Sequence, residues 1–244
     1  MIDVLITTVL RPQILQRTLA AAQEHCWGDE PVRLVVNVDP VGEATATTED
    51  IATICLGFAE ELLIRKAPEA KYPYSWAWCW TNARGPVVLW LMDDWEITEP
   101  CPLALWRGVM QAHDDLGGLR LPFWPAAGEN LRQWCQTYTW NGSFFECPEG
   151  QRMGFGVAGQ PMLLRGDFAR TTGPLIDVER NPEKQFHHHN KALKDEVLKW
   201  RWGCYGSPGC PAMFRDIGQK WRAEQGLVKT NPSFMTGWVK QEEK

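Results

Sequence analysis

The amino-acid sequence predicts a mixed α/β fold, in which a mostly parallel sheet is flanked by helices. Three observations support this class. Strand patterns alternate with helix patterns over residues 1–100, and the apolar runs that mark the strands end in polar or acidic side chains. The chain has 244 residues, of which 44% are hydrophobic, so it can bury one sizeable core. We therefore expect a single domain over 1–244, with 1–100 and 101–244 as its two halves.

The first strand, helix and strand are the clearest elements. Residues 4–10, "VLITTVL", are apolar and rich in β-branched side chains, which predicts a buried strand. A helix follows, because Pro12 suits a first helical turn and apolar residues then recur at helical spacing. Residues 32–40, "VRLVVNVDP", predict a second strand that ends at Asp39 and a proline. This order begins a parallel sheet.

The next stretch adds two further strands. Residues 47–62 begin with Thr and Asp at positions that suit a helix cap, and a short strand is expected at 63–67. Residues 72–85 predict a helix closed by Gly85, and 87–92 form an apolar strand. The acids after residue 92 then lie at the carboxyl edge of the sheet, where ligands of open α/β sheets gather.

The second half has a looser pattern, in which a β-rich region is expected. Asn181 and Pro182 suit a helix cap and a first turn, which predicts a late helix. The expected elements are a helix at 101–117, strands at 119–124 and 134–147, a strand leading to a turn at 159–171, a helix at 181–199, and a final helix or strand-to-helix unit at 213–227.

Three acids, Asp93, Asp94 and Glu96, follow the strand at 87–92. Side chains alternate along a strand, so Asp94 and Glu96 should share one side, with Asp93 on the other unless the chain turns there. Solvated turn acids, a general acid and base, or a site for Mg²⁺ or Mn²⁺ would each explain them. An acid and base pair normally comes from separate elements, whose surroundings push the two pKa values apart. We favour the cation, because hard cations prefer carboxylate oxygens and share substrate phosphates.

Three stretches, "VLITTVLRP", "VVNVDP" and "GPVVLWLMDDW", resemble the nucleotide-binding half of GT-A fold glycosyltransferases of the large inverting family 2 class. The resemblance covers residues 1–100 well and the rest more faintly, through "GQPMLLRGDFA" and the helix at 181–199. It implies a GT-A-type, Rossmann-like sheet. It also implies metal-dependent transfer of a hexose or pentose, with inversion, from a nucleotide sugar to an acceptor hydroxyl. A UDP-sugar is the first choice of donor.

The resemblance also implies roles for particular residues. Asp94 would carry Mn²⁺ or Mg²⁺ at the reacting diphosphate, and Asp93 would meet ribose or sugar hydroxyls of the donor. Glu96 would either ligate the metal through a water molecule or only hold a neighbouring loop. Many relatives have an acid where this chain has Met92, so either Asp93 and Asp94 suffice or the metal is held more weakly. The residues that would hold the nucleoside are Thr7, Thr8, Arg11 and Asp39.

The acceptor hydroxyl needs a base, which relatives take from a carboxylate at the start of a late helix. That helix opens here with "NPEKQF", so Glu183 is the candidate base, and Asp177 and Glu179 are its competitors. An ordinary first-turn acid is the alternative. The histidines at 187–189 cannot converge on one ion, because successive helical residues point about 100° apart. His187 still lies one turn beyond Glu183, within reach of the site.

The segment "RDIGQKWR" at 215–222 lies where relatives often carry a loop that closes over the pyrophosphate. Arg215, Lys220 and Arg222 would supply positive charge there, and Asp216 would be a further metal ligand. A plain amphipathic terminal helix is the alternative.

Two other functions stay open. A nucleotidyltransferase would want a glycine-rich loop after the first strand, and "TTVLRPQ" has no glycine; an inactive sugar-binding module is supported only by Met92. The expected acceptor is a glycan or a modified nucleic acid such as phage-type DNA with hydroxymethylated bases, because 180–229 has an excess of basic residues. No apolar run reaches membrane-spanning length, so we expect a cytoplasmic protein, or one of the host cytoplasm if phage-encoded.

Overall fold

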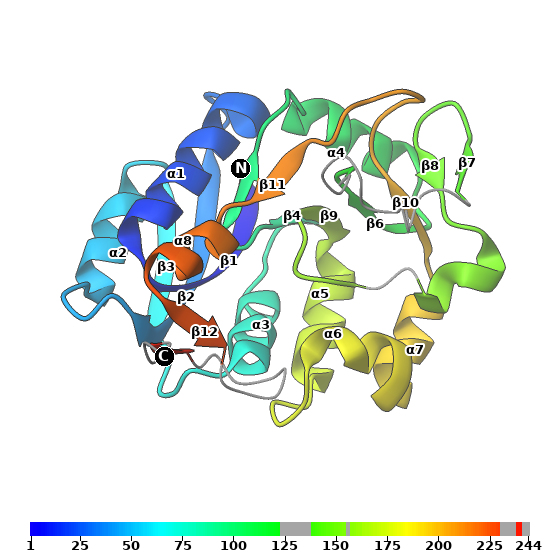
Figure 1. Ribbon diagram of the computed structural model, residues 1–244. Helices are drawn as coiled ribbons and strands as arrows, with labels where there is room; N and C mark the ends of the chain where they lie inside the picture. Colours follow the sequence, from blue (N-terminus) through cyan, green and yellow to red (C-terminus); the bar gives the residue numbers. More distant parts are fainter. Residues whose placement is uncertain (123–137, 155–156, 230–237, 241–244) are drawn as a thin grey trace.

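The computed structural model describes residues 1–122, 138–154, 157–229 and 238–240, and its first part alternates strands with helices as predicted (Figure 1). The elements are β1 (Ile2–Leu10), α1 (Pro12–Ala22), β2 (Val32–Gly42), α2 (Thr48–Leu56), β3 (Glu61–Lys66), α3 (Tyr72–Thr81) and β4 (Val87–Trp90). β2 pairs with β1 and β3, and β1 also pairs with β4, in every case in parallel. The carboxyl ends of all four strands therefore meet at one edge.

The second half extends the same sheet. Its strands are β6 (Leu116–Arg120), β7 (Thr139–Trp140), β8 (Phe145–Glu146), β9 (Met162–Arg165) and β10 (Arg201–Cys204). β9 runs antiparallel to β4 and β6, while β10 is parallel to β6 and antiparallel to β8. Within the described ranges the largest sheet has nine strands in the order β3-β2-β1-β4-β9-β6-β10-β8-β7. The predicted mostly parallel sheet is confirmed.

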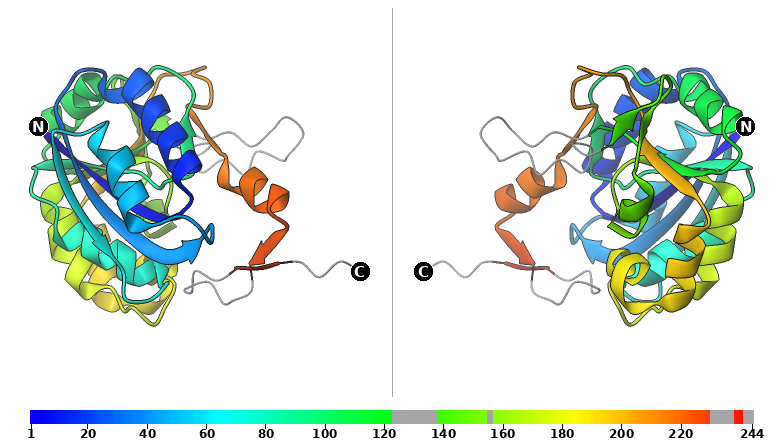
Figure 2. Two further views of the ribbon diagram at one scale, coloured as in Figure 1. Left: turned by 90° about the vertical axis from the view of Figure 1, so that its left-hand side faces the viewer. Right: turned by 90° about the vertical axis from the view of Figure 1, so that its right-hand side faces the viewer.

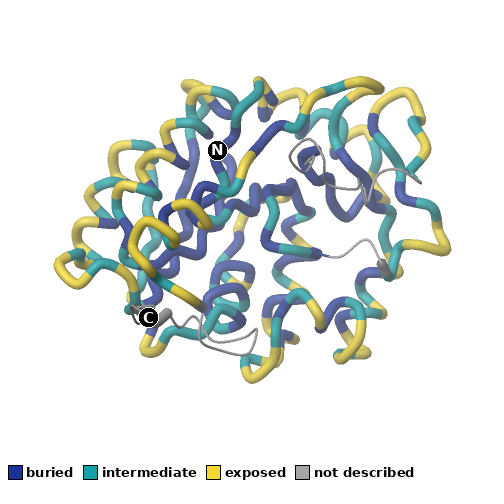
Figure 3. The backbone as a smooth tube through the Cα atoms, viewed as in Figure 1, coloured by how far each residue is buried: buried dark blue, intermediate teal, exposed yellow. Residues whose placement is uncertain are grey.

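Helices cover both faces of the sheet, and side chains alternate between two hydrophobic clusters. Val4 and Ile6 of β1 pack with α1, α2 and α4 (Leu103–Ala112), whereas Leu5 packs with α3, α5 (Gly166–Thr172) and α7 (Lys191–Leu198) on the other face. The central strands are accordingly buried (Figure 3). Three short helical turns, η1 (Gln23–Trp27), η2 (Glu149–Gly154) and η3 (Gly173–Leu175), complete the layers.

Large aromatic rings anchor α3 against the sheet. Trp76 stacks on Trp90 of β4 with ring centroids 4.9 Å apart, and Trp80 meets Trp90 edge to face at 5.8 Å. All three rings are fully buried, and each such ring removes a large apolar area from water. This packing fixes the start of α3, where Tyr72 lies, relative to the end of β4.

Several predicted elements differ from the structure. The helix predicted at 72–85 ends at Thr81 with Asn82 as its C-cap, so Gly85 does not close it. The strand at 159–171 leads into a helix, α5, in place of a turn. The predicted helix at 181–199 is divided into α6 (Pro182–Lys184) with η4 (Gln185–His189), and then α7. The division occurs at Asn190, whose side chain accepts hydrogen bonds from the N–H groups of Ala192 and Leu193 and so caps a new helix. The parts of the predicted strands at 119–124 and 134–147 that fall in 123–137 lie outside the described residues.

The last segment forms a strand-to-helix unit, one of the two predicted alternatives. β11 (Phe214–Asp216) pairs antiparallel with β5 (Trp95–Ile97), and α8 (Gly218–Glu224), β12 (Leu227–Lys229) and β13 (Trp238–Lys240) follow. Figure 2 shows α8, β12 and β13, coloured orange to red, to one side of the sheet and its helices. Among the described residues, no helix has the length and apolar character needed to cross a membrane.

Candidate active site at the carboxyl edge of the sheet

The candidate site forms where β1, β2 and β4 end. Arg11 follows β1, Asp39 lies in the last part of β2, and Asp93 and Asp94 follow β4. Since these strands are parallel neighbours, residues far apart in the sequence gather at this edge, and most of their polar side chains are buried.

The chain turns directly after β4, which brings Asp93 and Asp94 to the same cation. One terminal nitrogen of Arg11, Nη2, lies 2.5 Å from Oδ1 of Asp93 and 2.9 Å from Oδ2 of Asp94. Because the chain turns here, the alternation of side-chain directions along an extended strand does not apply to Asp93 and Asp94. Although burial opposes ionisation, the two carboxylates raise the pKa of the Arg11 guanidinium well above its usual value.

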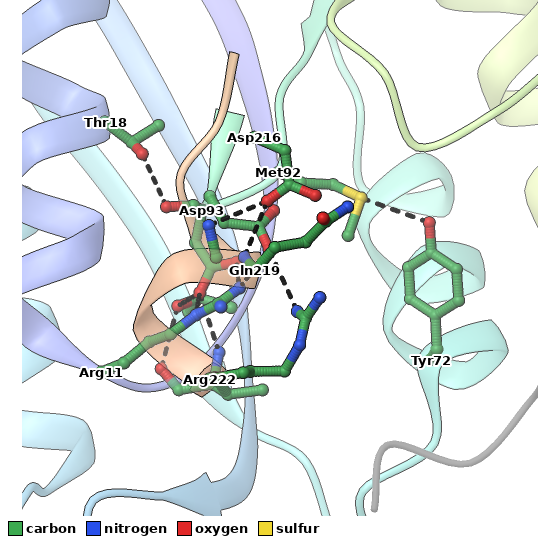
Figure 4. Close-up of polar contacts among 12 residues, drawn as sticks. Arg11, Thr18, Tyr72, Met92, Asp93, Asp216, Gln219 and Arg222 are labelled. Atoms are coloured by element: carbon green, nitrogen blue, oxygen red, sulfur yellow. Dashed lines mark hydrogen bonds and ion pairs between the residues drawn. The ribbon is translucent and has the colours of Figure 1, made fainter. Parts of the chain in front are cut away.

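Asp93 is held on both oxygens by the end of β1. Its Oδ2 accepts hydrogen bonds from Thr8 Oγ1 at 2.8 Å, from Arg11 Nε at 2.8 Å and from the Val9 amide at 3.3 Å. Thr18 of α1 donates to the Asp93 carbonyl at 2.6 Å (Figure 4). A carboxylate with this many donors is fixed in place, so Asp93 orients Arg11 and the turn.

Asp94 lies under the N-terminal end of α8. Its carbonyl accepts a hydrogen bond from the Ile217 amide at 2.9 Å, and its Oδ2 lies 4.0 Å from Nη1 of Arg222. A Cβ on Gly218 would lie 2.1 Å from the same carboxylate oxygen, so only glycine allows this approach. Trp221 of α8 covers Arg11, whose guanidinium carbon is 5.7 Å from the ring centroid. The last helix thus closes over the acidic turn.

A third carboxylate, that of Asp216, approaches Asp94 from β11. Its Oδ1 accepts hydrogen bonds from the amides of Gly218 at 2.8 Å and Gln219 at 3.0 Å, which leaves Oδ2 without a hydrogen bond to those amides (Figure 4). Burial raises the pKa of the Asp94 carboxyl above its usual value; Asp93 and Asp216 act in the same direction, and Arg11 opposes them. A further cation between Asp94 and Asp216 would relieve this repulsion.

Glu96 lies apart from these acids. It accepts hydrogen bonds from Arg17 at 2.6 and 3.0 Å and from Arg215, which pairs with it across β5 and β11. Burial acts in the opposite direction, but the two arginines lower the pKa of the Glu96 carboxyl. Within the described part of the chain, no three metal-ligating side chains gather as one cluster, so Asp94, Glu96 and Asp216 do not form a three-carboxylate site.

A polar network continues the site along the ends of β2 and β3. Asp39 Oδ1 accepts hydrogen bonds from Asn37 at 3.0 Å and from Ser75 at 2.5 Å, and Arg65 donates to Asn37 at 2.7 Å. The guanidinium of Arg65 lies over the Trp78 ring, 4.6 Å from its centroid. Thr7, also buried, belongs to the neighbouring end of β1. This network offers fixed polar groups beside flat rings, an arrangement that suits a nucleoside.

Glu183 lies beside α3, whose first residue is Tyr72. Oε1 of Glu183 accepts a hydrogen bond from the Gly159 amide at 2.9 Å. Asn181 caps α6 by accepting a hydrogen bond from the Lys184 amide at 3.0 Å. The hydroxyl of Tyr72 lies near the Glu183 carboxylate, because a Cβ on Gly159 would lie 2.6 Å from Tyr72 Oη and 3.3 Å from Glu183 Oε1. The importance of Tyr72 and Gly159 could not be read from the sequence, because their contacts with Glu183 join distant segments.

The other acids near the start of this helix point to surface partners. Glu179 pairs with Lys71 at 2.6 Å, and Asp177 pairs with Arg180 at 3.1 Å; both acids are exposed. His187 has its Nδ1 2.5 Å from the Met153 carbonyl, and burial lowers its pKa. Of these side chains, only that of Glu183 accepts a hydrogen bond from Gly159 and lies close to Tyr72.

No family model and no curated protein matches this sequence. Solved structures with a similar fold include S. aureus TarS (12% identity over 88% of this chain and 36% of that one, TM-score 0.61). A second is S. aureus TarS 1–349 in complex with UDP (13% identity over 87% of this chain and 59% of that one, TM-score 0.62). Another is mannosyltransferase PcManGT from Pyrobaculum calidifontis in complex with GDP-Man and Mn²⁺ (12% identity over 92% of this chain and 60% of that one, TM-score 0.53). The chain thus spans 36–60% of their length. The GT-A-type fold implied by the resemblance is confirmed.

Proposed function

We propose that the protein is a glycosyltransferase that moves a sugar from a nucleoside-diphosphate sugar to an acceptor hydroxyl, with inversion. The observation that carries the proposal is the buried group of Asp93, Asp94 and Arg11, closed by Arg222, at the carboxyl edge of this sheet. Buried arginines and carboxylates side by side suit a diphosphate, whose negative charge the arginines can meet directly and the carboxylates can meet through a bound cation. Solved structures with a similar fold include complexes with UDP, with UDP-GlcNAc and with GDP-Man.

The nucleoside would occupy the network at the ends of β1, β2 and β3. Asp39 is buried and already oriented by Asn37 and Ser75, so it can accept a hydrogen bond from a ribose or base without further ordering. Thr7 and Thr8 form the adjacent wall, and Arg11 stands between this wall and the acidic turn. This placement leads from the nucleoside to the diphosphate along one edge.

Asp94 and Asp216 are the two side chains that fit a divalent cation. Mg²⁺ and Mn²⁺ take one or two carboxylates from a protein and complete their ligands with water and substrate phosphates, so a three-carboxylate cluster is not required. The raised pKa of Asp94, caused by its burial and by the nearby carboxylates, fits a place where a positive charge is accommodated. Glu96 does not fit, because Arg17 and Arg215 hold both of its oxygens, whereas Arg11 and Arg222 approach only Oδ2 of Asp94. When bound, the cation would stabilise negative charge on the departing diphosphate.

The remaining residues act on charge and protons. Arg11 and Arg222 lie beside Asp94 and can donate to diphosphate oxygens, and Arg215 would turn from Glu96 to reach them. Glu183 is the proposed base: its carboxylate would take the proton of the acceptor hydroxyl as that oxygen attacks the anomeric carbon. Glu183 and Met92 are neighbours across Gly159, and Met92 precedes Asp93, so the proposed base lies close to the acidic turn.

The acceptor belongs to this proposal only as a class. It carries a hydroxyl and is either a glycan or a hydroxymethylated base in phage-type DNA, for which the basic residues of 180–229 would supply phosphate contacts. The two classes are separated by whether duplex DNA binds to the protein with an affinity that falls steeply as salt is raised.

A donor panel tests the proposed function. We expect the protein with Mn²⁺ to release nucleoside diphosphate from at least one of UDP-GlcNAc, UDP-glucose and GDP-mannose, because water can replace the acceptor slowly. Nucleoside diphosphate is measured against a blank without protein. Pyrophosphate release from UTP or GTP in the same assay would instead favour a nucleotidyltransferase. Binding of these donors with no product from any of them would favour an inactive sugar-binding module.

A further inference from the structure

Tyr72 joins the acidic turn to the proposed base. It is the first residue of α3, and its ring packs on Trp76 with centroids 5.4 Å apart, so the hydroxyl is directed away from the aromatic cluster. Figure 4 shows this hydroxyl pointing to the side chain of Met92, whose sulfur lies 3.4 Å from it. Met92 immediately precedes Asp93, so the phenol reaches the segment that carries the acids.

The same hydroxyl lies close to Glu183. Gly159 shows how close these groups are, since a Cβ there would lie 2.3 Å from Met92 Sδ, 2.6 Å from Tyr72 Oη and 3.3 Å from Glu183 Oε1. The Gly159 amide donates to Glu183 Oε1 at 2.9 Å, while the Tyr72 hydroxyl donates to Met92 Sδ. A carboxylate is a far stronger acceptor than a thioether, so rotation of the phenol proton from the sulfur to Glu183 would be favoured.

Tyr72 keeps its proton in this position. Burial raises the pKa of the phenol well above its usual value, and the carboxylates of Glu183 and Asp94 act in the same direction. A phenol that stays protonated is a permanent donor. It can therefore hold one orientation of the Glu183 carboxylate.

Met92 is what makes this arrangement possible. An acid at this position, as the resemblance would suggest, would stand next to the phenol and compete with Glu183 for its proton. It would also add a charge near Asp94 and Glu183. An uncharged thioether fills the space without either effect.

We infer that Tyr72 is a positioning residue for the base, which aims the Glu183 carboxylate at the acceptor hydroxyl through a hydrogen bond. The inference rests on the proposed function. It adds Tyr72 to Ser75 and Trp78, the residues of α3 that belong to the polar network of the site.

Kinetics of Tyr72→Phe test this role, with Tyr205→Phe as the matched control because Tyr205 packs on Trp106 outside the site. For a donor from the panel that the wild type turns over, we expect kcat to fall at least about tenfold, with the KM for the donor unchanged. In the Glu183→Gln background the same change should cause no further loss. Melting by circular dichroism should match the wild type, because the ring and its packing remain.

NMR spectroscopy tests the interaction between Tyr72 and Glu183 without turnover. The chain has four tyrosines, so protein labelled with ¹³C at the tyrosine ζ carbon gives few signals, and Tyr72→Phe identifies the one of interest. We expect Glu183→Gln to shift the Tyr72 signal and leave that of Tyr205 in place.

An unmoved Tyr72 signal, or undiminished kcat in Tyr72→Phe, would overturn the inference while transfer by the wild type still supports the proposed function. Equal losses from Tyr72→Phe with and without Glu183 would overturn it too, because they indicate a structural effect independent of the base. Absence of any transfer by the wild type would overturn the proposed function itself.

Discussion

Replacement of Glu183 by glutamine is expected to lower the turnover of sugar transfer by about 10²–10⁴-fold, the contribution that a positioned general base usually makes. The amide keeps an oxygen that can accept the Gly159 hydrogen bond, so the helix start should stay folded. It cannot take the proton of the acceptor. Donor affinity should stay within about twofold of the wild type, because the site for the nucleoside and diphosphate is built from other elements.

Steady-state kinetics with the best donor of the panel measure this effect, and calorimetric titration of the corresponding nucleoside diphosphate measures donor affinity. Glu196→Gln is the matched control, since Glu196 pairs with Lys199 on the surface of α7. Turnover close to the wild type would remove Glu183 from the role. A large loss in Glu179→Gln in its place would assign the role to that competitor.

Replacement of Arg11 by methionine is expected to lower the free energy of unfolding by about 3–5 kcal/mol, the usual cost of removing one partner from a buried ion pair. Only 3% of Arg11 is exposed, and its guanidinium serves both Asp93 and Asp94. Without it, two like charges remain buried side by side. Donor binding should be lost as well, because the acidic turn would then repel a diphosphate.

Urea unfolding followed by circular dichroism measures the change in stability. Arg84→Met provides the control: its side chain is 69% exposed and pairs with Glu61 on the surface, so a loss below about 0.5 kcal/mol is expected. A similarly small loss in Arg11→Met would show that the buried group does not depend on this arginine.

Local sequence patterns were sufficient for the donor-side half of the fold. Pro12 does lie in the first turn of α1, and Thr47 caps α2 with Asp50 in a reciprocal pair of hydrogen bonds. The strands β1, β2 and β4 were recognisable because runs buried on both faces are continuously apolar. Once these strands are parallel neighbours, the meeting of Arg11, Asp39 and the acids at one edge follows from topology.

The rest depends on contacts between distant segments. Glu96 pairs with Arg215 across two strands that are 119 residues apart in sequence, and no local pattern specifies this. The proximity of Tyr72, Met92 and Gly159 to Glu183 arises in the same way. The division of the late helix at Asn190 was also missed, because a helical pattern continues on both sides of it and only the side-chain cap marks the break. The placement of α8 over Asp94 needs Gly218, which in the sequence is one glycine among 21.

We propose above all that Asp94 and Asp216 hold a divalent cation against the diphosphate of the donor. Calorimetric titration with UDP and with GDP, in Mn²⁺ and in EDTA, tests it most directly on the wild type, Asp94→Asn and Asp216→Asn. Mn²⁺ should raise the affinity of the wild type for at least one of the two nucleotides by about tenfold or more, and should have little effect in Asp94→Asn or Asp216→Asn. Equal affinity with and without Mn²⁺ in the wild type would contradict the claim.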